Sequence, residues 1–195
     1  MPVEAELTAT VRDPEQVRAR LADRAAVERS TYADTYYDWP DHSLDAAGFE
    51  LRARTITTDE DARVVLTYKQ PPVDADSRSK PEHETEVADA TVLHEVFTGL
   101  GLAELISFKK YCENYRFSEQ GRDLLATVVE IPELDGQVFI ELETMAEPDD
   151  VADALGVVRA VLDGLGVTDQ DAVTESYTDM VAAHRSDADR PGSST

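Results

Sequence analysis

Apolar and polar residues alternate strictly at the start of the chain. From Val3 to Val11, every odd position is apolar and every even position is Glu or Thr. A period of two over this stretch predicts a β-strand with one apolar and one polar face. The same period predicts further strands at residues 28–38, 49–56, 63–70, 82–87, 105–117, 122–131 and 137–145.

Capping residues predict helices between and after these strands. Asp13-Pro14 joins an N-cap residue to a proline at the first helical position, which predicts a helix to about residue 25. Asp89 caps a second helix, which ends before Gly101. Two more helices are expected at residues 149–165 and 169–183. Residues 184–195 are expected to form a disordered polar tail, which leaves one domain over residues 1–183.

The strand order predicts the fold class, which is α+β. Eight strands that mostly follow one another through hairpins favour an antiparallel sheet, and such a sheet usually has one apolar and one solvated face. Eight strands suffice to close a barrel with room for a small ligand. We therefore expect a closed eight-stranded antiparallel β-barrel with helices packed outside. If its polar faces point inward, Glu, Arg and Lys line the lumen.

The composition excludes several classes of function. The 195 residues hold 41 acidic and 18 basic side chains, for a net charge of -23. A nucleic-acid binder or a protein docked on anionic membrane needs a basic face, so neither partner is expected. A single cysteine excludes an intrachain disulfide. The chain shows neither a long apolar run nor a signal-peptide pattern, so a cytoplasmic protein is expected.

The charged residues indicate a site only in combination. Four Glu-x-Glu pairs occur where about two are expected by chance, and alternate charges usually mark the wet side of a strand. Here, however, the pairs coexist with basic residues at matching phase on other strands: Arg52, Arg54, Lys69 and Lys110. Guanidinium and ammonium groups bind phosphates, and Mg²⁺ or Mn²⁺ prefers carboxylate oxygens. The combination suits a metal-bound triphosphate and is compatible with two-metal chemistry.

Short motifs along the chain resemble a known family in content and order. E-A-E-L-T (Glu4 to Thr8) resembles the hallmark E-x-E-x-K of the CYTH superfamily, the triphosphate tunnel enzymes that include class IV adenylyl cyclases and thiamine triphosphatases. Five further motifs follow in the family's order: T-Y-Y-D-W-P (35–40), L-D-A-A-G-F-E-L-R-A-R (44–54), L-T-Y-K (66–69), H-E-T-E-V (83–87) and V-F-I-E-L-E (138–143). E-S-Y-T-D-M (175–180) is similar to the C-terminal S-Y motif of the class IV cyclase branch.

The resemblance implies a role for each matching residue. It implies catalytic roles for Glu4, Glu6 and Lys110. It implies triphosphate binding by Arg52, Arg54, Lys69 and Lys110. It implies that Mg²⁺ or Mn²⁺ is bound by Glu4, Glu6, Glu84, Glu86, Glu141 and Glu143.

Two positions depart from the family pattern. Thr8 stands where the hallmark lysine belongs, and Cys112 stands where an arginine is usual in the family's K-x-R. Arg116, on the same strand face as Cys112, is expected to compensate as a further phosphate contact, and Lys109 is a weaker alternative. Each lost charge-assisted contact is worth about 1.5–3 kcal/mol.

Three functions follow as hypotheses. The first is a class IV adenylyl cyclase-like enzyme that converts ATP to cyclic AMP and pyrophosphate. The second is a hydrolase of thiamine triphosphate or inorganic triphosphate in the same tunnel. The third is a binding module for nucleotide or polyphosphate that has lost turnover, motivated by Thr8 and Cys112. The partner in each case is a small-molecule triphosphate, and the oligomeric state stays open between monomer and homodimer.

Overall fold

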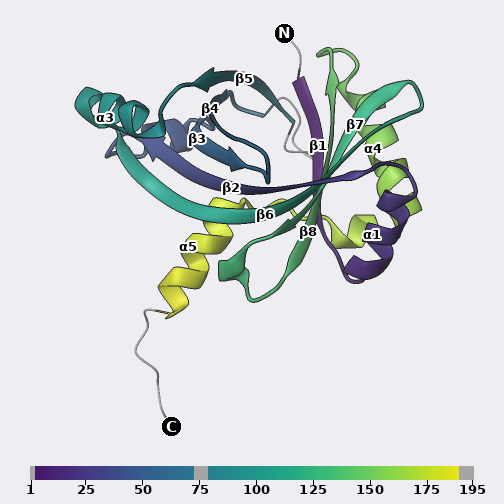
Figure 1. The fold of residues 1–195 in the computed structure, drawn as a ribbon. Coiled ribbons are helices and arrows are strands. Elements are labelled where there is room, and N and C mark those ends of the chain that lie inside the picture. The colour runs from purple at the N-terminus through teal and green to yellow at the C-terminus, as the bar shows by residue number, and fades with distance from the viewer. Residues whose placement is uncertain (1–2, 73–78, 189–195) are drawn as a thin grey trace.

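Eight antiparallel strands close into a barrel (Figure 1). The structure, a computed structural model, describes residues 3–72 and 79–188. Around the barrel the strands follow the order β1-β5-β4-β3-β2-β6-β7-β8, which confirms the predicted fold class. The strands are β1 (Val3–Thr10), β2 (Val27–Asp38), β3 (Glu50–Thr57), β4 (Ala62–Lys69), β5 (Lys80–Val87), β6 (Ala103–Glu119), β7 (Arg122–Glu130) and β8 (Val138–Ala146). The helices are α1 (Pro14–Ala22), α2 (Ser43–Ala46), α3 (Ala90–Leu100), α4 (Val151–Leu165) and α5 (Tyr177–Ala188), with single 3₁₀ turns η1 (Pro132–Leu134) and η2 (Asp169–Asp171).

The first and last strands close the barrel. β1 pairs with β8 along its whole length, from Val3 opposite Ala146 to Thr10 opposite Phe139. On its other side, β1 pairs with β5 only at its first two residues. The β1–β8 seam therefore joins segments from opposite ends of the chain and places their side chains next to one another.

The apolar half of the alternation faces outward, toward the helices. Leu142 of β8 and Ala9 of β1 pack with Leu21 of α1 and with Val158 and Leu165 of α4 in one buried cluster. Figure 1 shows α1 and α4 on this side of the barrel. Because these residues point out of the barrel, the charged residues that alternate with them point in.

One end of the barrel interior is apolar and is covered by α5. Phe139 shares its strand face with the inward glutamates of β8, and it packs with Cys112 of β6 and Val181 of α5. The Phe139 and Tyr177 rings meet edge to face at 5.2 Å between centroids. The helix thus seals this end and brings its first residue, Tyr177, to the boundary of the charged interior.

The prediction of a helix over residues 169–183 was wrong in its bounds. Thr168 and Asp171 cap each other and close only the turn η2. The chain then runs extended beside β1, where Val173 donates its N–H to the carbonyl of Thr8 at 2.8 Å. This long-range pairing prevents a helix from forming until Tyr177.

The same helix includes the start of the expected tail. It continues to Ala188, and Arg185 binds Glu133 at 2.7 Å and the carbonyl of Ser107 at 2.7 Å. Residues 184–188 are therefore folded, and residues 189–195 lie outside the described residues. Elsewhere α1 ends at Ala22, slightly earlier than predicted, and α2 forms between the predicted strands at 28–38 and 49–56, where no helix was predicted. Within the described ranges, none of the helices is both long and apolar enough to cross a membrane.

Candidate functional site

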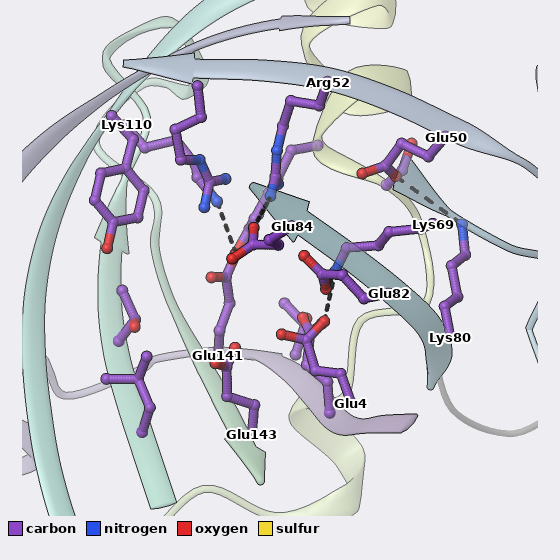
Figure 2. Close-up of a pocket in the computed structure, with 18 of the residues that line it drawn as sticks. Glu4, Glu50, Arg52, Lys69, Lys80, Glu82, Glu84, Lys110, Glu141 and Glu143 are labelled. Atoms are coloured by element: carbon purple, nitrogen blue, oxygen red, sulfur yellow. Dashed lines mark hydrogen bonds and ion pairs between the residues drawn. The ribbon is translucent and has the colours of Figure 1, made fainter. Parts of the chain in front are cut away.

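A charged cavity of about 470 Å³ occupies the barrel interior (Figure 2). Its volume lies in the range of sites that hold small molecules. The acidic residues that line it are Glu4, Glu6, Glu50, Glu82, Glu84, Glu141, Glu143 and Glu175. The basic residues are Arg52, Arg54, Arg63, Lys69, Lys80, Lys110 and Arg116. The structure therefore brings most of the predicted site residues to one place.

Three glutamates at the β1–β8 seam form a carboxylate triad. Glu6 and Glu143 lie directly opposite each other in the register, and Glu4 is the next inward residue on β1. One oxygen from each of the three lies within 4.8 Å of the others. Burial raises the pKa of Glu4, and burial with the charges of Glu4 and Glu6 raises the pKa of Glu143 well above its ordinary value. Carboxylate oxygens are the donors that Mg²⁺ and Mn²⁺ prefer, and a divalent cation among these three would neutralise their mutual repulsion.

The other predicted metal ligands do not belong to this triad and have partners of their own. Glu141 accepts a hydrogen bond from Lys110 at 3.1 Å. Glu84 accepts one from the hydroxyl of Thr67 at 2.8 Å. Glu86 is largely exposed and pairs with Arg63 at 2.8 Å, so it is not brought into the cavity with the others. Among the described residues, Glu4, Glu6 and Glu143 are thus the group that could hold a metal ion.

Two of the predicted phosphate-binding cations, Arg52 and Lys110, are hydrogen-bonded to side chains that line or border the cavity. Arg52 is buried and donates to Thr67 at 3.2 Å, while its Nε has no hydrogen-bond partner among the described residues. Lys110 lies between Glu141 and the ring of Tyr177, 4.9 Å from the ring centroid. Burial lowers the pKa of the Lys110 ammonium, but the negative charges around it, first Glu141 and then Asp34, together outweigh burial and raise the pKa overall. Both groups are therefore charged, and both line the cavity.

Arg54 is fixed by a residue that sequence reasoning missed. It binds Asp34 of β2 through two hydrogen bonds of 2.6 and 2.7 Å, and its guanidinium lies 4.4 Å from the centroid of the Tyr32 ring. Asp34 is completely buried, which alone would raise its pKa, but Arg54 and the neighbouring Arg52 and Lys110 hold that pKa well below its usual range. Asp34 is therefore the buried counter-ion of the side of the cavity that carries Arg52, Arg54 and Lys110.

The remaining cations lie on other parts of the cavity wall. Lys69 contacts Glu4 at 2.5 Å and Glu82 at 2.8 Å. Arg116 is exposed and lines the cavity on the side of Leu125, its partner on β7.

Several lining residues were not among the predicted site residues. Glu50 alternates with Arg52 and Arg54 on one strand face, and Glu82 precedes Glu84 in the same way, so the period of two could have found both. Lys80 follows a proline-rich segment with no periodic pattern and gave no signal. It lies 3.9 Å from Glu50. Tyr177 also lines the cavity, and it belongs to the E-S-Y-T-D-M motif without being among the predicted site residues.

The two departures from the family pattern lie in different environments. Thr8 lines the cavity and donates to Glu6 at 3.1 Å. Cys112 shares the inward strand face of Lys110, but it is buried in the apolar cluster beneath α5, beside Phe139 and Val129. Only Thr8 therefore stands where a cation would face a ligand.

We expect Thr8→Lys to change ligand binding and Cys112→Arg to change stability. Lysine at position 8 would enter a charged cavity beside Glu6, and one added charge-assisted contact should tighten triphosphate binding about tenfold or more. Arginine at position 112 would bury a guanidinium in an apolar cluster, at about 3–5 kcal/mol of stability. Titration calorimetry with inorganic triphosphate would measure the binding of the Thr8→Lys variant. Urea unfolding would measure the stability of the Cys112→Arg variant. A stable Cys112→Arg chain that binds triphosphate tightly would contradict this placement.

The Cys112 thiol is expected to resist alkylation in the folded protein. Burial raises its pKa to about 12, so almost no thiolate is present at pH 8. Mass spectrometry should show an unmodified cysteine after iodoacetamide treatment of native protein and complete modification in urea. Rapid alkylation of the native chain would show that the cluster beneath α5 opens readily.

Comparisons with known proteins agree with this geometry. A protein of Methanocaldococcus jannaschii that is provisionally named an adenylate cyclase is 23% identical over 181 residues, covering 91% of this chain and 98% of that protein. A solved structure from Pyrococcus horikoshii has a TM-score of 0.79 and 26% identity, covering 92% of this chain and 98% of that one. A Hippeastrum protein, provisionally named an adenylyl cyclase and described as having a dominant triphosphatase activity, has a TM-score of 0.66 and 18% identity, covering 94% and 96%.

The family itself is identified by a match that spans nearly the whole described chain. The CYTH domain matches residues 3–177, from the first strand of the barrel to the first residue of α5. The match includes the triad Glu4, Glu6 and Glu143 and the cavity cations Arg52 and Lys110. The chain therefore belongs to the CYTH domain family.

Proposed function

We propose that this protein is a metal-dependent enzyme of the class IV adenylyl cyclase type, which converts ATP to cyclic AMP and pyrophosphate. The observation that carries the proposal is the division of the cavity into two walls. The Glu4, Glu6 and Glu143 triad lies at the β1–β8 seam, and Arg52 of β3 and Lys110 of β6 line the same cavity. Figure 2 shows Arg52 and Lys110 across the cavity from Glu4 and Glu143. A triphosphate with its divalent cation needs both walls at once.

Each wall has its own task in this proposal. Arg52 has a buried Nε without a partner among the described residues, which suits a phosphate oxygen at that point. Lys110 and Arg54 would neutralise further phosphate oxygens, and Asp34 keeps Arg54 in one orientation. The triad would hold Mg²⁺ or Mn²⁺, which supplies charge neutralisation at the phosphates. With the phosphates fixed, the ribose 3′-hydroxyl can attack the α-phosphorus and pyrophosphate can leave.

A second candidate is hydrolysis of a triphosphate in the same cavity. It is supported by the triphosphatase activity described for the Hippeastrum protein, whose fold this chain shares. The same phosphate contacts would then direct water to the terminal phosphorus. A third candidate, a binding module without turnover, is supported by Thr8, which leaves the cavity one cation poorer than the family hallmark.

Product analysis separates these candidates. Purified protein is incubated with ATP, thiamine triphosphate or inorganic triphosphate, with Mg²⁺ or Mn²⁺, at low and at molar salt, and chelator-treated samples serve as controls. Cyclic AMP with pyrophosphate from ATP is the expected result. Orthophosphate without cyclic AMP would establish the hydrolase instead. Binding without any product under all conditions would establish the binding module.

A further inference from the structure

The ammonium group of Lys69 lies between two glutamates that have different neighbours. Its Nζ is 2.5 Å from Glu4 and 2.8 Å from Glu82 (Figure 2). All three side chains are nearly buried, with 12%, 13% and 10% of their surface exposed for Lys69, Glu4 and Glu82. The Coulomb attraction between buried charges at these distances is stronger than that of surface ion pairs, which solvent screens.

Only one of the two glutamates belongs to the carboxylate triad. Glu4 contributes an oxygen to the cluster formed with Glu6 and Glu143, whereas Glu82 is not part of that cluster. Glu82 instead lies directly opposite Lys69 in the β4–β5 register, so its nearest cross-strand partner is the lysine itself. The ammonium is thus shared between a group suited to a metal and a group that the fold pairs with the lysine.

This sharing matters because a cation at the triad competes with Lys69 for Glu4. A lysine that depended on Glu4 alone would remain bound to it and would repel a divalent ion. A lysine with a second buried carboxylate keeps a partner when Glu4 turns to the metal. The ammonium can donate up to three hydrogen bonds, so it remains available to a phosphate oxygen as well.

We propose that Glu82 is a positioning residue that retains Lys69 and thereby frees Glu4 for the divalent cation. The role rests on the proposed function, because it takes the triad as the metal site and Lys69 as a phosphate contact. Glu82 acts on the metal only through Lys69 and does not bind the metal itself. Removing Glu82 should therefore weaken metal binding, and removing Lys69 as well should abolish that effect.

Mn²⁺ binding without any triphosphate tests this role directly. Calorimetric titration would compare the wild type with Glu82→Gln, Lys69→Met and the double variant. We expect Glu82→Gln to weaken Mn²⁺ binding about tenfold, the size typical of residues that orient a metal ligand. Lys69→Met should bind at least as tightly as the wild type, and the double variant should match Lys69→Met. Glu82→Asp, which keeps a carboxylate, should recover part of the affinity.

Matched controls exclude a general loss of structure. Glu60→Gln makes the same substitution at an exposed position between β3 and β4 and should leave Mn²⁺ binding unchanged. Lys69→Gln is measured as well as Lys69→Met, so that a variant without the lysine is still available if one of the two fails to fold. Thermal unfolding is recorded for every variant.

Three results would overturn the role of Glu82, and they differ from one another. If Glu82→Gln weakens Mn²⁺ binding equally with and without Lys69, Glu82 is itself a ligand. If Glu82→Gln has no effect while the wild type binds Mn²⁺, Lys69 does not compete for Glu4, and the proposed function stands without this role. If the wild type binds no Mn²⁺, the metal site of the proposed function fails together with the role built on it.

Discussion

Glu143→Gln is expected to abolish metal-dependent turnover and, at the same time, to raise the thermal stability of the metal-free protein. Glu143 is buried beside two other carboxylates, and their charges and its burial raise its pKa well above the ordinary value. The neighbouring negative charges therefore destabilise the ionised form of Glu143. Glutamine removes that repulsion and also removes the charge that a divalent cation needs.

The two effects have different sizes and are measured separately. Loss of one carboxylate from the metal triad should reduce turnover by on the order of a hundredfold or more, because metal sites contribute several kcal/mol to the transition state. Each kcal/mol of relieved repulsion should raise Tm by about 2–4 °C in a chain of this length. Product formation and calorimetric unfolding in chelator would record them.

A nearby glutamate provides the control for this experiment. Glu147 follows β8 directly, is exposed and lies outside the cavity lining as described, so Glu147→Gln should change neither turnover nor Tm. Metal-dependent turnover that survives Glu143→Gln would show that the triad is not the metal site. A fall in Tm would show that Glu143 has a stabilising partner instead of repelling neighbours.

Asp34→Asn is expected to destabilise the protein by about 3–5 kcal/mol, as removal of one partner from a buried ion pair usually does. The carboxylate accepts both hydrogen bonds from Arg54 and also offsets the charges of Arg52 and Lys110. Asparagine would leave these cations without their common counter-ion. Urea unfolding should show the loss, and inorganic triphosphate should restore part of it, because phosphate can supply the missing negative charge.

The pH dependence of this loss follows from the pKa of Asp34. The folded state lowers that pKa below the ordinary value of 3.8, so its stabilising effect is complete above that value. It is lost as the pH falls below 3.8 toward the folded-state pKa. The stability gap between wild type and Asp34→Asn should therefore be constant from pH 8 to about 5 and narrow below about 4. Asp59→Asn, at an exposed turn position, is the control and should show no gap. A gap that closes already at neutral pH would mean that Asp34 is not the ionised partner of Arg54.

The strands and most of the cavity lining were predictable because one rule holds over most of this barrel. Apolar residues face the helices and charged residues face the interior, so the alternation in β1 or β8 reports both the strand and the direction of each side chain. The same rule predicts that Cys112 faces the cavity. Its side chain does point inward, but α5 packs against the interior at that end. The alternation along a strand cannot distinguish a cavity from a packed end of the barrel.

The contacts between segments that are distant in the sequence could not be predicted from the sequence. Asp34 meets Arg54 only through the register of β2 with β3, and Lys69 meets Glu82 only through that of β4 with β5. The start of α5 was missed for a similar reason, since the backbone of Val173 binds that of Thr8 across the fold. Local propensity at residues 169–176 contains no trace of that contact.

The seam between β1 and β8 has a consequence for how the protein is made. During synthesis β1 leaves the ribosome before the other barrel strands, whereas its full-length partner β8 is the last of them to emerge. The edge of β1 that faces β8 therefore stays unpaired until β8 has been made, a state that favours association with other chains. A truncated product that stops before β8 would have neither a closed barrel nor Glu143, so incomplete chains should be inactive and prone to aggregate. Contacts between such distant segments also form slowly, which places barrel closure late in folding.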